Sequence, residues 1–175
     1  ITGVTPSTFI HVCVFKARLW FIPTSSMSVW YMPTFSIGGA ATQFDMSTLF
    51  NRGGYVMAMT SWSLDAGQGM DDYAAFITSE GQVAIYRGTD PSSSVTWALV
   101  GVFDIGAPVG RRCFIKFAGD VVLLCQDGAV PLSKALMSTR VNISVALTDK
   151  IQQAIGEYIV QYGSNFGWES VLFPK

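Results

Sequence analysis

The sequence predicts a mostly β protein built of antiparallel, propeller-type blades, with one helix near the C-terminal end. Three observations predict this fold class: short apolar stretches separated by turn residues, glycine-containing connections between them, and an internal repeat that reads strand, turn, strand. Hydrophobic residues make up 50% of the 175 and charged residues only 13%. This composition excludes a disordered chain, because disorder requires low hydrophobicity and high net charge.

Strands are predicted where β-branched and aromatic residues cluster between Gly, Pro, Ser and Asp. In chain order these stretches are 9–15, 19–22, 27–32, 55–59, 73–78, 83–86, 97–103, 113–117 and 121–125. The pairs Glu80-Gly81, Gly119-Asp120 and Asp127-Gly128 each lie between two such stretches. Glycine supplies the positive φ that tight hairpins need, so neighbouring stretches are expected to pair in antiparallel fashion.

One helix is predicted within 147–163. Apolar residues recur there with the period of a helix, at Ile151, Ile155, Tyr158, Ile159 and Tyr162. Thr148 or Asp149 is expected to cap its start, and Gly163 is suited to its end. Residues 168–173 then return to a strand pattern.

An internal repeat relates three hairpins. Residues 113–128 align with 11–26 at a shift of 102, and the segment ending at Gly81 aligns with the one ending at Gly128 at a shift of 47. Phe15 then falls on Phe117, and Leu19 on Val121. Repeats of about 40–50 residues with up to four strands are typical of propeller blades. Chance similarity among β-rich hairpins is the alternative.

The repeat defines the expected domain organisation. We expect consecutive blades over 1–146, a helical insertion over 147–163, and the start of a further strand or blade over 164–175. A blade needs a neighbour on each side, so we expect the chain to be a segment of a longer polypeptide. Seven side chains are predicted to be buried inside blades: Phe15, Leu19, Phe76, Ile85, Phe117, Val121 and Leu123.

Charge and hydropathy restrict the partners. The net charge is −1, from 11 basic and 12 acidic residues, which is not the pattern of a protein that grips nucleic-acid phosphates. Apolar runs fall far short of the ~20 residues that a membrane helix needs. So few charges suggest a subunit that buries part of its surface against neighbours. Cys13, Cys113 and Cys125 lie among apolar residues and are predicted to be buried, reduced thiols.

No catalytic site is predicted. His11 is the only histidine, it lies in an apolar strand, and no nucleophile-elbow or phosphate-loop motif accompanies it. Residues 63–67 match the first half of the Asp-box of sialidase-type propellers, but Gly69 and Met70 replace its Thr and Trp. The Arg111-Arg112 pair would diverge on a strand. We therefore expect no enzyme and no cofactor.

Metal and sugar binding are the remaining possibilities for a site. Asp71 and Asp72 would point to opposite faces of a strand, so with Asp65 nearby a solvated turn is favoured over a calcium loop. Exposed tryptophans can stack on sugars, but core or subunit packing is favoured here. The five tryptophans are Trp20, Trp30, Trp62, Trp97 and Trp168.

The chain resembles the β-propeller tail proteins of short-tailed bacteriophages, both the nozzle or tail tubular protein B type and the packaged-DNA stabilisation proteins. The resemblance covers roughly residues 9–175 and consists of many short pieces. These pieces are 9–21 (FIHVCVFKARLWF), 28–31, 37–40, 44–45, 52–55, 79–81, 88–92, 97–101, 106 and 110–112.

The resemblance implies a structural subunit of the virion tail. It implies a ring of several copies, six in such nozzles, below the portal and adaptor, with tail fibres or spikes on its flank. That ring would form the exit channel for double-stranded DNA without sequence specificity, and it would retain the packaged genome. Assembly would take place in the bacterial host cytoplasm. No residue is assigned to DNA contact, and a receptor- or glycan-binding propeller module of a virion is the alternative.

Overall fold

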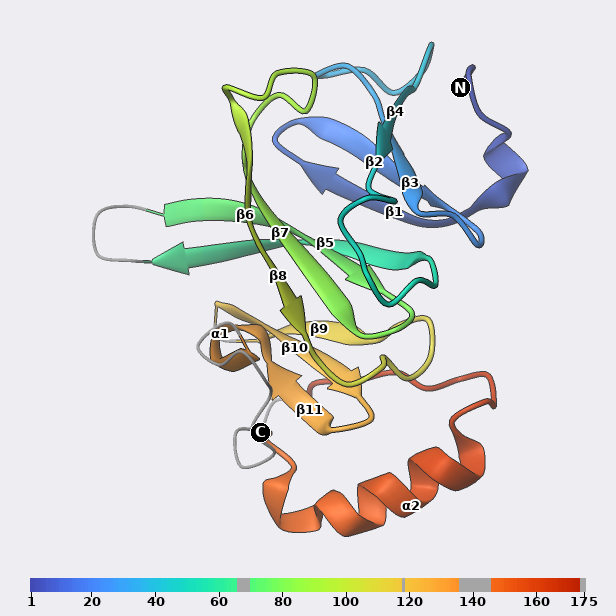
Figure 1. Cartoon of the computed structure of the whole chain (residues 1–175), viewed down its shortest axis with the longest axis vertical. Coiled ribbons are helices and arrows are strands. Elements are labelled where there is room, and N and C mark those ends of the chain that lie inside the picture. The colour runs from blue at the N-terminus through green and yellow to red at the C-terminus, as the bar shows by residue number, and fades with distance from the viewer. Residues whose placement is uncertain (66–69, 118, 136–145, 174–175) are drawn as a thin grey trace.

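The computed structural model describes residues 1–65, 70–117, 119–135 and 146–173, without the side chains of 64, 65, 70, 71 and 135. It is mostly β, with three antiparallel sheets (Figure 1). Sheet 1 contains β1 (Phe9–Phe15), β2 (Arg18–Pro23), β3 (Ser28–Tyr31) and β4 (Thr42–Asp45). Sheet 2 contains β5 (Val56–Asp65), β6 (Met70–Thr78), β7 (Gln82–Gly88) and β8 (Trp97–Asp104). Sheet 3 contains β9 (Phe114–Phe117), β10 (Asp120–Cys125) and β11 (Gly128–Pro131).

Each sheet is a meander in which strands that follow one another along the chain pair side by side. The three sheets follow one another down the molecule, with sheet 2 between the other two (Figure 1). The mostly β class and the antiparallel pairing are therefore confirmed. A propeller is not confirmed, because the sheets do not close into a ring.

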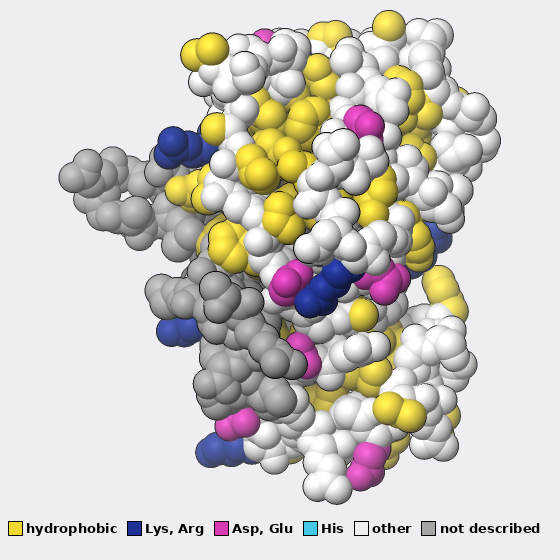
Figure 2. All heavy atoms as spheres, viewed as in Figure 1, with side chains coloured by type: hydrophobic (Ala, Val, Ile, Leu, Met, Phe, Trp, Pro, Cys, Tyr) yellow, Lys and Arg dark blue, Asp and Glu magenta, His cyan; other side chains and the backbone are white. Residues whose placement is uncertain are grey.

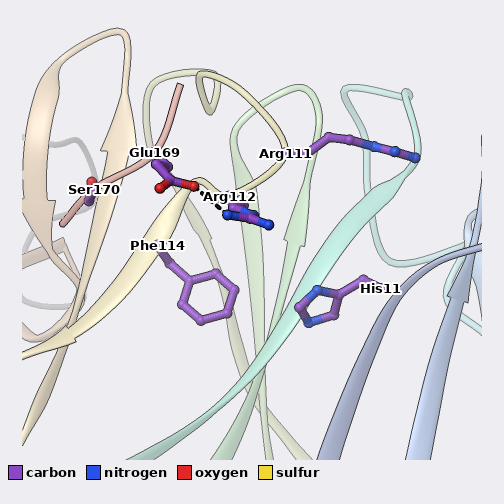
Figure 3. Close-up of a pocket in the computed structure, with 6 residues that line it drawn as sticks. All are labelled: His11, Arg111, Arg112, Phe114, Glu169 and Ser170. Atoms are coloured by element: carbon purple, nitrogen blue, oxygen red, sulfur yellow. Dashed lines mark hydrogen bonds and ion pairs between the residues drawn. The ribbon is translucent and has the colours of Figure 1, made fainter. Parts of the chain in front are cut away.

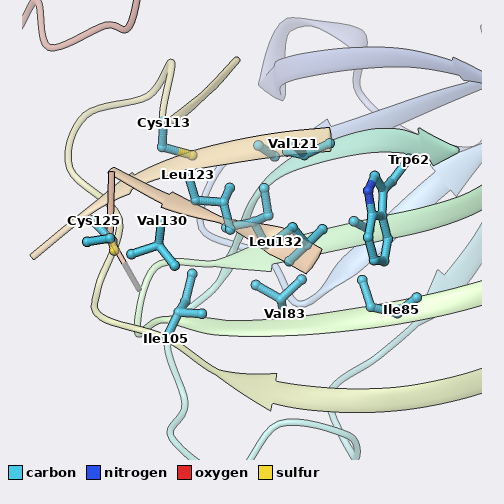
Figure 4. Close-up of a cluster of buried hydrophobic side chains, with 14 residues drawn as sticks. Trp62, Val83, Ile85, Ile105, Cys113, Val121, Leu123, Cys125, Val130 and Leu132 are labelled. Carbon is cyan, nitrogen blue, oxygen red and sulfur yellow. The ribbon is translucent and has the colours of Figure 1, made fainter. Parts of the chain in front are cut away.

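Sheet 2 is buried on both faces. Ala74 to Ile77 on β6 and Val83 to Ile85 on β7 are fully buried. This explains why β6 and β7 contain continuous apolar runs and do not alternate between apolar and polar residues. Toward sheet 3, Trp62, Val83 and Ile85 pack against Val121 and Leu123 (Figure 4).

The interface between sheets 1 and 2 is aromatic. The Trp97 ring stacks between Tyr86, 5.3 Å away, and Trp20, 5.5 Å away. Phe15 meets Trp97 edge to face at 6.0 Å. Such aromatic pairs contribute roughly 0.5–1.5 kcal/mol beyond the area that they bury, so this interface fixes the stacking of the two sheets.

The predicted hairpin turns are present. Gly81, Gly119 and Gly128 have φ of 77°, 79° and 101°. At Gly81 a Cβ atom would also collide with the Ile105 carbonyl oxygen, so this turn requires glycine for its space as well as its φ. Each turn joins two strands that pair as expected.

The three repeat copies have the same orientation in their sheets. Side chains of the second strand in each sheet alternate between two faces. One face is directed toward the preceding sheet in the chain, or outward in sheet 1, and the other toward the following sheet, or outward in sheet 3. The first, here called the preceding face, contains 19 and 21, 74 and 76, and 121 and 123; the second, the following face, contains 20 and 22, 75 and 77, and 122 and 124. The shift of 102 also maps the closing pair of the first hairpin, Phe15 and Arg18, onto Phe117 and Asp120.

Five of the seven predicted core residues are buried: Phe15, Phe76, Ile85, Val121 and Leu123. Leu19 is only half-buried, and the prediction for Phe117 is wrong, because its side chain is 47% exposed. Both lie at the ends of the stack. Phe117 is on the following face of sheet 3, and no fourth sheet covers it, whereas its counterpart Phe15 is covered by sheet 2.

The helix near the C-terminal end is confirmed as α2 (Gln152–Tyr162), which follows the 3₁₀ turn η3 (Asp149–Ile151). The predicted cap is wrong: neither Thr148 nor Asp149 caps α2, whose N-cap is Ile151 without a side-chain hydrogen bond. The Thr148 hydroxyl accepts a hydrogen bond from the Ala129 amide of β11. Gly163 does end the helix, with its amide donating to the Ile159 carbonyl.

The expected strand after the helix is absent from the described part of 164–175. Glu169 makes one isolated parallel bridge with Arg112, and the rest of 164–173 is irregular. The strand β4 and the short helix α1 (Leu132–Ala135) were not predicted, and β11 was expected only as the partner strand across the Asp127-Gly128 turn, without bounds.

Candidate functional site

The first strands of the three sheets lie along one edge of the stack. β1 lies beside β5, where the His11 Nε2 atom is 2.8 Å from the Met59 carbonyl oxygen. The β9 strand reaches β5 through Lys116, whose ammonium donates to the Ser61 hydroxyl at 2.6 Å. This edge therefore brings together residues about 50 and 100 positions apart in the sequence, as the meander order of the sheets requires.

A groove lies on this edge, with a volume of about 750 Å³ and an adjoining hollow of about 310 Å³. Its walls come from β1, the start of β5, the loop before β9 and the segment after α2. The smaller hollow is lined by His11, Arg111, Arg112, Phe114, Glu169 and Ser170 (Figure 3). We take this groove as the candidate site, because it holds the only histidine and the only adjacent arginine pair of the chain.

The two arginines precede β9, so the strand on which their divergence was expected is not present, but their side chains do point apart (Figure 3). Arg112 donates to the Glu169 carboxylate at 2.5 Å, whereas Arg111 points away from it (Figure 3). Within the described ranges Arg111 forms no ion pair. One cationic side chain in the groove thus remains available to an anionic group.

His11 is a packed, half-buried imidazole. Its ring meets Phe114 edge to face at 6.0 Å, and its Nε2 donates to the Met59 carbonyl oxygen. Burial lowers the pKa of His11, and the hydrogen bond to Met59 opposes this effect only in part. Since Met59 occupies Nε2, the imidazole is held as a structural group at the wall of the groove.

Of the acidic residues considered as calcium ligands, only Asp72 has a described side chain, and it is bonded to other residues. Asp72 accepts hydrogen bonds from Lys16 and Ser63, each at 2.7 Å, and the contact with Lys16 lowers its pKa most. Residues 66–69, which end the first half of the Asp-box and begin its second half, and the side chains of Asp65 and Asp71 lie outside the described residues. Among those described, no three His, Cys, Asp or Glu side chains form a group suited to a metal ion.

The cysteines are free thiols. Cys113 and Cys125 are buried, which raises their pKa to about 12 and about 11. Cys13 is only half-buried, so the prediction of a buried thiol is wrong there, although burial still raises its pKa. Thiols with raised pKa carry little thiolate and are poor nucleophiles.

Three of the five tryptophans are core residues: Trp20, Trp62 and Trp97 are 1%, 2% and 6% exposed. Trp30 and Trp168 are half-buried. Trp168 lines the groove, and its indole nitrogen donates to the Tyr162 carbonyl at 2.8 Å. Packing therefore accounts for most of these rings, as the sequence favoured.

From the sequence, His11 and the arginine pair were considered separately, Trp168 only as one of five tryptophans, and Glu169 not at all. The repeat contained a usable signal, because the shift of 102 aligns residue 11 with residue 113, which follows Arg112 directly and precedes β9. No comparable signal marked Glu169, which comes from the irregular segment after α2.

Comparison with known proteins gives no family: no family model matches the chain, and no curated protein matches it. Over the described residues, no helix has the length and apolar character needed to cross a membrane.

Proposed function

We propose that the chain contributes consecutive blades of a β-propeller to a structural subunit of a short-tailed phage tail. The observation that carries this proposal is the repeated orientation of the sheets, in which each copy presents one face to the preceding sheet and the other to the following sheet. A stack of this kind extends by adding like sheets, and propellers are the fanned, closed form of such a stack.

Exposed apolar side chains at the ends of the stack support assembly with other protein surfaces. Val12 and Val14 on the outer side of sheet 1 are 57% and 64% exposed, and Phe117 on the outer side of sheet 3 is 47% exposed. Figure 2 shows further apolar side chains gathered over sheets 1 and 2, with few charges among them. Depletion of charge and exposure of apolar surface are features of surfaces that become buried in an assembly.

The proposed role is a nozzle or hub ring of several copies, six by resemblance, that extends the DNA exit channel and retains the packaged genome. Its neighbours would be the portal or adaptor and the tail fibres or spikes, and its location the virion tail after assembly in the host cytoplasm. Shape and assembly, without catalysis, would carry this function. The near-zero net charge suits a conduit, because a strongly basic bore would hold DNA phosphates.

The receptor- or glycan-binding alternative has less support. Trp20, Trp62 and Trp97 are buried in the sheet interfaces and cannot stack on a sugar. No observation singles out a sugar site at Trp30 or Trp168.

Imaging of phage tails tests the proposal. Tails purified from the phage that encodes this chain, with a label fused to the protein, should show the label in a symmetric ring on the particle axis in negative-stain images. A protein that purifies as a free particle, with none of it associated with tails, would contradict the proposal.

A further inference from the structure

The two ends of the stack carry complementary faces. The following face of sheet 3, with Ile115, Phe117, Val122 and Leu124, aligns at the shift of 102 with Cys13, Phe15, Trp20 and Ile22. Those four residues of sheet 1 are the ones directed at sheet 2, where Phe15, Trp20 and Ile22 are buried. Sheet 3 therefore ends the stack with the type of face that packs on a following sheet. Helix α2 lies beyond sheet 3 on this side (Figure 1), and Val122 is already buried, so Phe117 is the side chain of this face that remains exposed.

Sheet 1 begins the stack with the opposite type. Its preceding face, with Val12, Val14, Leu19 and Phe21, aligns with Phe114, Lys116, Val121 and Leu123. In sheet 3 these equivalents face sheet 2, and Val121 and Leu123 are buried there. Phe9, at the start of β1, covers Phe21, and the two rings stack 4.7 Å apart. Val12 and Val14 on the same face remain exposed.

The end faces thus repeat the two sides of an interface that already exists inside the chain. A contact between them would continue the packing of sheet 1 on sheet 2 and of sheet 2 on sheet 3. It joins different surfaces of the two partners, so it is a head-to-tail contact, which produces a closed ring or an open filament.

We propose that two copies of this chain associate head to tail, with the Val12 and Val14 face of sheet 1 on the Phe117 face of sheet 3. Two copies supply six sheets by doubling the three of one chain, a number within the roughly four to eight blades of known propellers. Closure by two copies leaves neither face exposed. The inference rests on the proposed blade arrangement but not on the tail role.

Paired variants test the direction of this contact. Val14→Asp and Phe117→Asp each place a carboxylate on one exposed end face, where it disturbs the fold little and would be costly to bury. Sedimentation equilibrium of the unaltered chain should give a dimer, and each variant alone should give a monomer. Because Val95 is 90% exposed and lies on neither face, Val95→Asp is the matched control and should remain a dimer.

Mixing the two variants distinguishes a head-to-tail contact from the alternatives. Closure by two copies forms two such contacts, so a dimer of either single variant has a carboxylate in both of them. A mixed dimer of the Val14→Asp and Phe117→Asp chains has one intact contact and one that holds both carboxylates, so an equimolar mixture should recover a one-to-one dimer through the intact contact. A monomeric unaltered chain, a dimer that only one of the two substitutions disrupts, or a mixture that remains monomeric would each overturn the inference. None of these results would affect the imaging of tails, so failure here is distinct from failure of the proposed function.

Discussion

Lys16 and Ala17 form the two-residue turn between β1 and β2 with φ of 48° and 57°, a left-handed conformation that side chains disfavour. Two contacts hold this turn. The Lys16 ammonium pairs with Asp72 of sheet 2 at 2.7 Å, and the Ala17 carbonyl accepts from the Phe35 amide at 2.8 Å. The repeat places Gly119, with φ of 79°, at the position of Ala17.

Ala17→Gly should therefore stabilise the protein. Removal of the Cβ atom relieves the left-handed strain, and after the entropy cost of glycine we expect the free energy of unfolding to rise by about 0.5–1 kcal/mol. Urea unfolding followed by circular dichroism measures this change. The reverse substitution Gly119→Ala, where a Cβ would meet no atom within 4 Å, should destabilise by a similar amount; a loss of stability in Ala17→Gly would contradict the account.

We expect the free energy of unfolding to depend on pH through His11, because burial lowers the pKa of its side chain in the folded chain. The unfolded chain takes up a proton first as pH falls, so the contribution of His11 to stability is complete above about pH 6.5 and declines below it. The slope cannot exceed about 1.4 kcal/mol per pH unit for one proton. As the only histidine, His11 is the sole imidazole that can produce such a slope.

Urea unfolding at a series of pH values between neutral and mildly acidic measures the slope. The unaltered chain should lose stability as pH falls, and His11→Gln should be flatter over that interval, whatever its absolute stability. Equal slopes in both proteins would show that His11 is not the group responsible.

At the scale of elements, Gln82 joins β7 to the loop before β5. Its buried amide oxygen accepts from the amides of Asn51 and Arg52 at 3.1 and 3.0 Å. Its amide nitrogen donates to Asn51 at 2.8 Å and to Asp104 at 3.0 Å. A fully bonded polar group of this kind fixes the loop to the sheet.

Gln82→Met keeps the length of the side chain and leaves these partners without hydrogen bonds. We expect the free energy of unfolding to fall by about 2–4 kcal/mol, measured by urea unfolding. Gln43 is an exposed control whose amide donates only to the Ser28 hydroxyl at 2.9 Å; Gln43→Met should change stability by less than about 0.5 kcal/mol. Similar effects at both positions would contradict the role assigned to Gln82.

Elements that bury a face were predictable from the sequence. The bounds of β1 were predicted correctly, since its β-branched and aromatic residues end where Lys16 and Ala17 turn. The β4 strand was missed because Thr42–Asp45 is short and mostly exposed, so no apolar alternation marks it. The 168–173 stretch has apolar residues but no strand to pair with beyond the single bridge at Glu169.

The candidate site was predictable only in part. His11 and the arginine pair stood out by residue type, but their proximity depends on three first strands lying along one edge. That arrangement is set by the stacking of sheets, which strand periodicity does not reveal. The repeat did reveal it indirectly, because equivalent positions on successive sheets must lie near the same edge.

At the scale of the whole molecule, the stack has a direction. Sheet 2 buries both faces because it has a like sheet on each side. Sheets 1 and 3 each have a like sheet on one side only, and their outer faces leave Val14 and Phe117 exposed although Phe21 and Val122 are buried there. We therefore propose that the described chain is part of a larger ring of sheets.

A cryo-electron microscopy map of the assembly that contains this chain tests that claim most directly. The account predicts a closed ring of sheets in which another antiparallel sheet covers Val12 and Val14, and a further one covers Phe117. A map in which these side chains face solvent, on a three-sheet particle with no neighbour at either end, would contradict it.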